Sequence, residues 1–491
     1  MKRNKFLLIF VPLFFMSFLL AGCGNAADQA TDSTSSLSAD NINLVFVASP
    51  DLAFSAPGDV NPATANLSSQ GLQRSLLMAT YLKQQVLGGK NVNRIYALAP
   101  MTHLQTAANY PDMAAIGFIQ QFAMLNQISI YGAGGYGSPL ISANSFPINA
   151  GYAAGPIPSG VAKPLVACPT CQGLDFNDTN SSNEVLVATI LAIRTPGFYV
   201  FSAPWETISA LLANVNKKSG WNFSLPAAFP GPNDVYAVSV TTAGSASLTT
   251  YHGDLKPAAT YPALPSPVGG AACTAQKPFR ITATEGVDGA KIPAGSNTNE
   301  TVYLIRHTEA HPTFGWDDGN YVAAGQWRAL ALPNALRGKI SPTEVYSIDP
   351  AQAINASDLV AGLIDFSYIR ATLTVEPYAI ANNLPYSLVS EFELLDPNSP
   401  KLTSDKFFSG GAFSNKAILL AWEHQHFPPT VTALLASYFP AGQAPTAPDW
   451  PEDDYDTIWT VKLDAQGNLT VDNAVCEGID SSKLPATAPQ Y

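Results

Sequence analysis

Residues 301–309 read TVYLIRHTE, and this stretch decides the fold. Its first five residues form an apolar run rich in β-branched side chains, which is typical of a buried strand. Arg306 and His307 follow the run directly, so both are expected where the strand ends. An earlier run, NLVFV at 43–47, has the same character. The two runs predict the opening strands of two similar α/β units.

Matching segments follow both runs in the same order. A helical pattern opens at Gly71 and its counterpart opens at Gly325, although Pro333 interrupts the second pattern. Strands that alternate with helices indicate βαβ units, so we predict two tandem three-layer α/β domains with mainly parallel sheets. Such sheets bind ligands beyond the carboxyl ends of their strands. The other strand-like pairs are 94–100 with 344–350, 184–187 and 197–202 with 416–421, and 234–238 with 456–460.

Breaks in composition divide the 491 residues. Stretches rich in Pro, Ala, Gly, Ser and Thr are typical of spacers and linkers. The predicted parts are a lipoprotein signal peptide (1–22), a lipidated cysteine with a flexible spacer (23–40), a first domain (41–255), a linker (256–276), a second domain (277–476) and a tail (477–491).

The amino terminus has the features of a targeting segment. Three basic residues precede an apolar stretch of 15 residues, 6–20, which is short for a transmembrane span. The sequence LAGC at 20–23 resembles a bacterial lipobox, which implies lipid attachment to Cys23. Gly24, rather than Asp, favours the outer membrane if the source is Gram-negative. We therefore expect a body anchored in the bacterial envelope, facing the periplasm or the surface; a short membrane anchor is the alternative.

The charge balance limits the partners. The chain has 25 basic and 37 acidic residues, a net charge of −12, and loss of the leader would leave 22 basic residues and a net charge of −15. An acidic body disfavours nucleic acid, whose phosphates need Lys and Arg. It still permits one small anion in a pocket with a locally positive field.

Four cysteines remain besides the lipidated Cys23, and an even number suits disulfides in an oxidising compartment. The simplest of the three arrangements pairs Cys168 with Cys171 and Cys273 with Cys476. A redox pair at 168–171 and a zinc site are alternatives, although only one close Cys pair exists.

Four motifs in the second half carry a family resemblance. The strand end LIRHTE at 304–309 resembles the signature of the histidine phosphatase superfamily, also called phosphoglycerate mutase-like. Three later segments also resemble that family's motifs, in its order: GQWRAL at 325–330, RATLTVEP at 370–377 and AILLAWEH at 417–424. The resemblance implies a phosphatase that hydrolyses a small phosphomonoester without a cofactor or a metal.

The resemblance also implies a role for each site residue. His307 would attack phosphorus and form a phosphohistidine, as a neutral imidazole can. Arg306 and Arg370 would bind the phosphate as bidentate donors, and His424 would support the charge as a cation. His426 is expected near the pocket mouth, in contact with substrate.

The leaving oxygen also needs a proton. The family commonly takes it from a carboxyl group on a loop between the middle Arg and the late His. The candidates there are Glu391, which we favour, Glu393 and Asp396, while Glu423 beside His424 is a further candidate.

The first half departs from the family pattern. It has Ala48 and Ser49 in place of Arg-His, a residue near Thr102 in place of the middle Arg, and Ala203 in place of the late His. It therefore resembles a degenerate copy that lost the phosphate site. Ser49 as a nucleophile would lack a base. The histidines at 103 and 252 are expected to be structural.

Two close histidine pairs leave a metal site open as an alternative. His307 with His311 superficially resembles a zinc-protease helix, but Pro312 disfavours a helix there. His424 and His426 would share one face of a strand and could chelate a metal. The prediction is no metal, with a metal-dependent hydrolase as the weaker alternative.

The combined expectation is an envelope-tethered phosphatase whose second domain is catalytic. Its rival is a non-enzymatic lipoprotein that uses the fold for ligand binding or scaffolding.

Overall fold

The computed structural model describes most of the chain. The described residues are 31–32, 35–131, 138–153, 157–158, 169–178, 180–268, 270, 276–311, 317–354, 365–389 and 398–491. The predicted leader and Cys23 lie outside them, so the lipid anchor stays a prediction. Within these ranges, no helix has the length and apolar character needed to cross a membrane.

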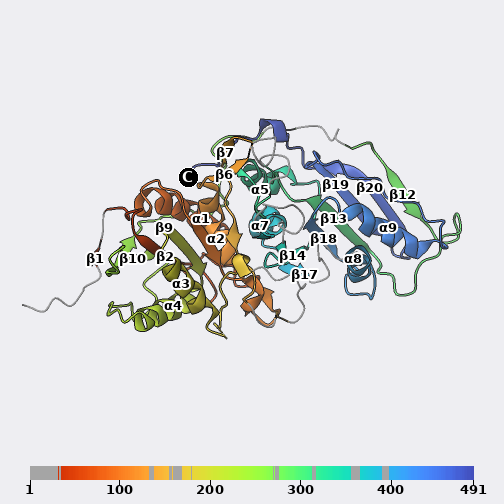
Figure 1. The fold of residues 1–491 in the computed structure, drawn as a ribbon. Helices are drawn as coiled ribbons and strands as arrows, with labels where there is room; N and C mark the ends of the chain where they lie inside the picture. Colours follow the sequence, from red (N-terminus) through yellow and green to blue (C-terminus); the bar gives the residue numbers. More distant parts are fainter. Residues whose placement is uncertain are drawn as a thin grey trace, which may run out of the picture.

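Two seven-stranded sheets form the framework (Figure 1). The first contains, in spatial order, β1 (Thr31–Asp32), β11 (Ala246–His252), β10 (Asp234–Val240), β2 (Ile42–Ala48), β9 (Gly197–Ala203), β3 (Arg94–Ala97) and β8 (Ile148–Asn149). The second contains β12 (Arg280–Ala283), β20 (Leu469–Cys476), β19 (Thr457–Leu463), β13 (Glu300–Arg306), β18 (Ala417–Trp422), β14 (Glu344–Ile348) and β17 (Tyr386–Val389).

Both sheets have the same internal plan. In the first, β2, β9, β3 and β8 are parallel neighbours, and β10 and β11 extend the sheet in antiparallel pairing. In the second, β13, β18, β14 and β17 are the parallel neighbours, and β19 and β20 are the antiparallel extension. Only the edge strands differ, because β1 is parallel to β11 and β12 is antiparallel to β20. The predicted α/β class with mainly parallel strands is confirmed.

Helices cover both faces of each sheet. They are α1 (Ser69–Tyr81), α2 (Ala114–Met124), α3 (Ser182–Ile193), α4 (Trp205–Lys218), α5 (Ala323–Ala335), α7 (Arg370–Asn382), α8 (Ser399–Phe408) and α9 (Phe427–Tyr438). Core contacts place α1 and α2 on one face of the first sheet and α3 and α4 on the other. In the second sheet α5 and α7 cover one face, and α8 and α9 the other. The four inner helices, α1, α2, α5 and α7, meet in the middle of the molecule (Figure 1).

Smaller elements complete the chain. They are the strand pairs β4 (Leu104–Gln105) with β5 (Tyr110–Pro111), β6 (Ile128–Tyr131) with β7 (Leu140–Ala143), and β15 (Ala353–Ile354) with β16 (Phe366–Ser367), and the short helical turns η1 (Leu82–Val86), η2 (Pro100–Thr102), η3 (Pro169–Cys171) and η4 (Ser481–Lys483).

The two opening strands form as the sequence predicts. Every residue of β2 is buried, and β13 is buried at five of its seven positions. A parallel strand covered by helices on both faces must be apolar on both faces. This requirement explains why both runs are continuous rather than alternating.

Two local expectations differ from the structure. The run 184–187 was predicted as strand-like but belongs to α3. A short apolar run has no periodicity that separates a strand from a buried helix. Helix α5 also continues past Pro333 to Ala335, because a proline in the last turn removes few hydrogen bonds.

The cysteines are partly described. Cys171 and Cys476 are each disulfide-bonded. Cys168 and Cys273 lie outside the described residues, so the pairing stays a prediction.

A buried acid lies between the inner helices. Glu376 of α7 is 2% exposed and faces Gly117 of α2, where an added Cβ would overlap its carboxyl group. Burial, with a further contribution from Asp112, raises the pKa of Glu376 to about 8. The carboxyl is therefore protonated in the folded protein at neutral pH.

We expect Glu376→Gln to stabilise the protein increasingly as the pH rises from about 4.5 to about 8. The unfolded carboxyl ionises near its ordinary pKa of 4.5, whereas the folded carboxyl keeps its proton up to about pH 8, so the wild type loses stability across this window. Urea unfolding of both proteins at several pH values measures the difference. A difference that is constant with pH would contradict the assignment.

Candidate active site

The second sheet brings predicted site residues to one edge. Strands β13 and β18 are parallel neighbours, with Arg306 opposite Trp422. The backbone N–H of His307 donates to the Trp422 carbonyl at 3.0 Å. The residues that follow the two strands, His307 on one side and Glu423 and His424 on the other, therefore meet beyond the carboxyl ends of the strands.

The carboxylate of Glu423 is the centre of this group. Its Oε2 atom lies 3.0 Å from His307 Nε2 and 3.1 Å from Arg370 Nη2. The same oxygen accepts the Tyr368 hydroxyl at 2.8 Å, while Oε1 accepts the backbone N–H of His424 at 3.1 Å and contacts its ring Nδ1. Burial would raise the pKa of the Glu423 carboxyl, but His307, His424 and Arg370 hold it well below its usual range.

His307 has its two ring nitrogens in different surroundings. The side chain is fully buried, and Nδ1 lies 2.7 Å from the Thr308 carbonyl oxygen. A carbonyl only accepts, so Nδ1 carries a proton and Nε2 is the nitrogen that can become a nucleophile. Burial lowers the pKa of His307 to about 4; Glu423 opposes this shift, and Arg370 and Arg306 add to it.

Arg306 is buried under the loop that precedes β19. Its Nη1 donates to the carbonyl of Glu452 and, at 3.5 Å, to the carbonyl of Asp454. The guanidinium carbon lies 4.0 Å from the ring centre of Tyr455. These neutral contacts fix the group without neutralising its charge.

Arg370 enters the site as the first residue of α7. Its Nη1 lies 2.6 Å from both carboxylate oxygens of Asp317, and its guanidinium carbon is 4.5 Å from the ring centre of Tyr368. Asp317 and Tyr368 were not predicted from the sequence. A carboxylate and an aromatic ring that position an arginine carry no local motif, so only their placement shows the role.

Three buried nitrogen atoms in this group have no hydrogen-bond partner among the described residues. They are Arg306 Nε, Arg370 Nε and His424 Nε2. Buried donors normally find partners, so nitrogen atoms that no protein group satisfies are available to a bound ligand or water. An anion with several oxygens would satisfy cationic donors in such a place, with shorter and stronger bonds than neutral ones.

A second buried arginine supports the segment after His307. Arg328 of α5 donates to Glu309 at 2.8–3.1 Å through Nε and Nη2, and to Glu477 at 2.7 Å through Nη1. Thr374 of α7 accepts the backbone N–H of Thr308 at 3.0 Å. These bonds fix the turn that carries His307, and they explain the arginine in the GQWRAL motif.

Other predicted residues lie apart from this centre or outside the description. His426 is half-buried, and its ring stacks on Trp422 at 4.3 Å. His311 is exposed, with its ring centre 6.3 Å from that of His307. The predicted proton donor Glu391 and its alternatives Glu393 and Asp396 lie outside the described residues.

The metal alternative takes a different form from the predicted histidine pairs. His307, Glu423 and His424 each offer a ligand atom within 4.8 Å of the others, so their spacing could hold a metal ion. However, the Arg370 guanidinium already binds the same carboxylate, and Arg306 adds a second positive charge. Cationic neighbours oppose a divalent cation and favour an anion. We therefore interpret the group as an anion site.

The first sheet has other residues at the corresponding edge, beyond the carboxyl ends of β2 and β9. The backbone N–H of Ser49 donates to the Ala203 carbonyl at 2.9 Å, as His307 does to Trp422. By this register the counterpart of His424 is two residues beyond Ala203, at Trp205, which corrects the placement at Ala203.

Two further counterparts complete the comparison. Helix α2 begins at Ala114 where α7 begins at Arg370, so the middle Arg corresponds to Ala114 rather than to a residue near Thr102. The supporting arginine is retained, because Arg74 of α1 lies 2.7 Å from Asp59.

The two histidines of the first half have ordinary partners, as expected of structural residues. His103 lies 2.9 Å from Asp112 and stacks on Phe176, and His252 lies 2.8 Å from Asp234.

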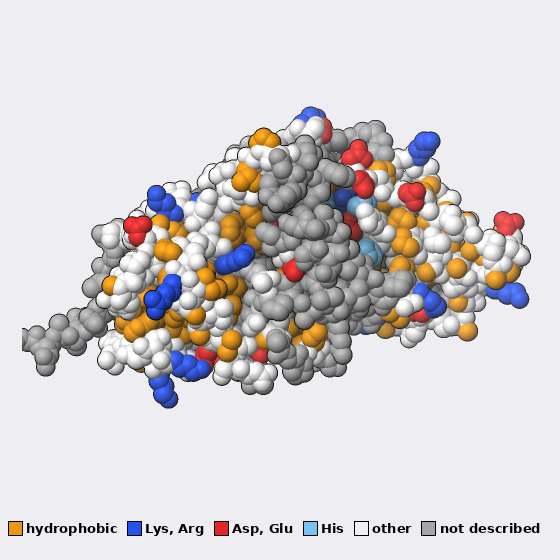
Figure 2. Space-filling view, in the orientation of Figure 1, with side chains coloured by type: hydrophobic (Ala, Val, Ile, Leu, Met, Phe, Trp, Pro, Cys, Tyr) orange, Lys and Arg blue, Asp and Glu red, His pale blue; other side chains and the backbone are white. Residues whose placement is uncertain are grey.

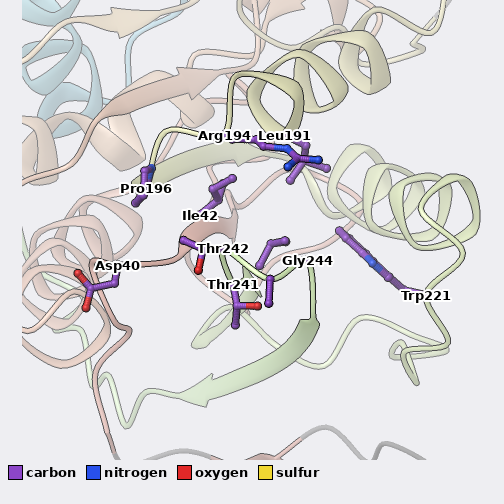
Figure 3. Close-up of a pocket in the computed structure, with 11 residues that line it drawn as sticks. Asp40, Ile42, Leu191, Arg194, Pro196, Trp221, Thr241, Thr242 and Gly244 are labelled. Atoms are coloured by element: carbon purple, nitrogen blue, oxygen red, sulfur yellow. The ribbon is translucent and has the colours of Figure 1, made fainter.

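A separate pocket of about 320 Å³ lies at the opposite edge of the first sheet, where β2 and β9 begin (Figure 3). Arg194, Trp221 and the 241–244 turn line it. It contains none of the anion-site residues.

In the second half, histidine side chains reach the surface beside acidic and basic groups (Figure 2).

Neither a protein-family model nor a curated protein sequence matches the chain. Solved structures give partial similarities. A phosphoglycerate mutase from Plasmodium falciparum has a TM-score of 0.24 and 12% identity, and covers 40% of this chain and 99% of its own. A putative phosphohistidine phosphatase SixA from Agrobacterium tumefaciens has a TM-score of 0.19 and 17% identity, over 34% of this chain and 92% of its own.

A phosphoserine phosphatase mutant from Entamoeba histolytica, solved with phosphoserine, has a TM-score of 0.21 and 15% identity, over 36% of this chain and 97% of its own. These neighbours are enzymes of the histidine phosphatase type. Scores this low carry no argument about function, which rests on the site geometry above.

Replacing Arg328 with Ala should destabilise the protein by about 3–5 kcal/mol, because Glu309 and Glu477 would stay buried without their cation. Chemical unfolding measures the loss. Arg337→Ala is the matched control, since Arg337 is exposed and donates to Asn334 in the same segment. That control should change stability by less than about 0.5 kcal/mol. Equal effects of the two substitutions would contradict the role of the network.

Proposed function

We propose that the chain is a phosphatase that hydrolyses a phosphomonoester through a phosphohistidine at His307. The orphaned donors carry the proposal, because Arg306 Nε, Arg370 Nε and His424 Nε2 are buried beside the nucleophile with no partner among the described residues. A phosphoryl group offers several charged oxygens to such donors, and fixed donors stabilise its charge in the transition state.

The residues divide the work as follows. His307 Nε2 attacks phosphorus, with Nδ1 held by the Thr308 carbonyl so that the ring keeps its orientation. Arg306 and Arg370 hold the phosphoryl oxygens, and His424 supports the charge. A carboxyl group protonates the leaving oxygen; Glu391 and Glu423 are the candidates.

We further propose that the two halves arose by tandem duplication and that the first is a degenerate copy. Both sheets share one strand plan, and both retain the buried arginine of the first inner helix, at Arg74 and Arg328. The first half has Ser49 and Trp205 where the second has His307 and His424. The first half would then support its neighbour without catalysis.

The proposed location is the bacterial envelope, through a lipid on Cys23. The lipobox-like sequence at 20–23 supports it, as does the use of cysteines in disulfides. An envelope enzyme of this kind would release phosphate from small phosphorylated compounds.

A chromogenic phosphomonoester assayed with the full chain at about pH 5 to 7 tests the activity. We expect His307→Ala to reduce hydrolysis to background and to abolish an acid-labile phosphoenzyme, because the nucleophile is lost. His252→Ala is the matched control, since His252 lies at the end of β11, where it pairs with Asp234, and should keep full activity.

Two results would overturn the proposal. Equal background from the wild type and His307→Ala, with no trapped phosphoenzyme, would favour a binding or scaffolding module. Loss of activity in EDTA would favour the metal-dependent alternative at His307, Glu423 and His424.

A further inference from the structure

The turn 317–321 of the second half holds Arg370 in two ways. The Asp317 carboxylate accepts hydrogen bonds from the Arg370 guanidinium at 2.6 Å. The Gly319 carbonyl accepts the backbone N–H groups of Ile369 and Arg370, each at 3.0 Å. A long arginine side chain loses much rotamer freedom when it is held in one position, so its neighbours must fix it before it can bind an anion in a defined geometry. The position of Arg370 therefore depends on the position of this turn.

Gln120 of α2, in the first half, binds this turn. Its side-chain amide exchanges two hydrogen bonds with the amide of Asn320, at 2.9 and 3.1 Å, across 200 positions of the sequence. Asn320 also donates to the Phe146 carbonyl at 2.9 Å and accepts the backbone N–H of Tyr321 at 2.8 Å. Both donor and both acceptor positions of the Asn320 amide are thus used. A buried polar network that is fully satisfied is rigid, so Asn320 has one fixed orientation.

Ser145 of the first half is a second anchor of the same turn. Its buried hydroxyl donates to the Asp318 carboxylate at 2.6 Å, and that carboxylate also accepts the backbone N–H of Asn320 at 3.1 Å. The neighbouring Asn144 carbonyl accepts the backbone N–H of Ala323 at 3.0 Å. The turn is therefore bound to the first half at both its side chains and the backbone that follows it.

The turn also packs closely against Ser367. Gly319 has a φ of +76°, and a Cβ there would lie 1.9 Å from the Ser367 carbonyl oxygen. The Ser367 hydroxyl accepts the backbone N–H of Ala150 and donates to the Cys171 carbonyl, both at 3.1 Å. Ala150 and Cys171 belong to the first half. The surface against which Gly319 packs is thus held by the first half as well.

We propose that the first half is a positioning element of the active site, in which Gln120 and Ser145 fix the turn 317–321 and thereby the anion-binding geometry of Arg370. The inference rests on the proposed phosphatase function and gives the first half a defined part in it. Neither residue contacts the group around Glu423, so both are positioning residues. Helix α2 is the counterpart of α7, so the helix that carries the middle Arg in one half carries a positioning residue in the other.

Gln120→Met tests the role of the amide, because methionine keeps the length of the side chain and removes its hydrogen bonds. We expect the Kd of inorganic phosphate, measured by calorimetry, to rise by about 10- to 100-fold, and kcat/KM for a phosphomonoester to fall by a similar factor. Gln121→Met is the matched control. Gln121 is the next residue of α2, equally buried, and donates to the Pro489 carbonyl, so both values should stay at the wild-type level.

Ser145→Ala is a milder second variant and should change both values in the same direction. Its control is Ser202→Ala, since the buried Ser202 hydroxyl donates to the Ala115 carbonyl within the first half. Thermal unfolding of all four variants measures the stability that each one loses. If the controls weaken phosphate binding as much as Gln120→Met and Ser145→Ala do, the two residues act only on the stability of the fold, and the inference is wrong.

A double-mutant cycle tests the path to Arg370. Asp317→Asn weakens the bond between the turn and the guanidinium, so Gln120→Met should then cost less phosphate affinity than it does in the wild type. Fully additive losses would overturn the inference.

The inference and the proposed function fail in different ways. If His307→Ala abolishes hydrolysis while Gln120→Met and Ser145→Ala keep the wild-type Kd and kcat/KM, the positioning role is wrong and the phosphatase proposal stands. If the wild type binds inorganic phosphate but hydrolyses no phosphomonoester, the phosphatase proposal fails. The Kd of phosphate in the same variants then still decides whether Gln120 and Ser145 position Arg370.

Discussion

The parallel pairing of β13 with β18 is the constraint on which the rest of the site depends. The pairing sets Arg306 opposite Trp422, so the next residues of both strands project from the same edge. Side chains more than a hundred positions apart in the chain thereby come within hydrogen-bond distance. A shift of one residue in this register would turn His307 away from Glu423, and the site residues would no longer meet.

The site is a buried charge cluster in an acidic protein. The whole chain has a net charge of −12, yet at this edge Arg370 and two histidines contact one carboxylate, and Arg306 lies near His307. Hydrogen bonds fix both arginine side chains: Arg370 donates to Asp317, and Arg306 donates to backbone carbonyls. Burial makes these interactions strong, because water screens them little. A small anion can therefore bind here while a long polyanion meets an unfavourable field outside.

The two halves share one strand order, but the chemistry at their strand ends differs. Both have an arginine buried in the first inner helix, and this arginine pairs with a carboxylate of the segment between the opening strand and that helix. Among the described residues, cationic groups that could bind an anion gather at the strand ends of the second half, where Arg306 and Arg370 lie. The halves pack through their inner helices, where Glu376 fills the space that Gly117 leaves open. The first half thus buries the helices that carry Arg328 and Arg370.

The sequence by itself determined the fold class, the opening strands, and four members of the site. Continuous apolar runs specify buried parallel strands, and residues at strand ends must lie at the functional edge. Local patterns failed at 184–187 and at the counterparts of Arg370 and His424, because short apolar runs and loop lengths do not fix the register. Only the tertiary structure decided that Glu423 bridges His307, His424 and Arg370, and that Asp317 and Tyr368 position the arginine. Those contacts join residues that lie far apart in the sequence, and their spacing along the chain does not predict that they meet. The contacts form only once the strands have paired.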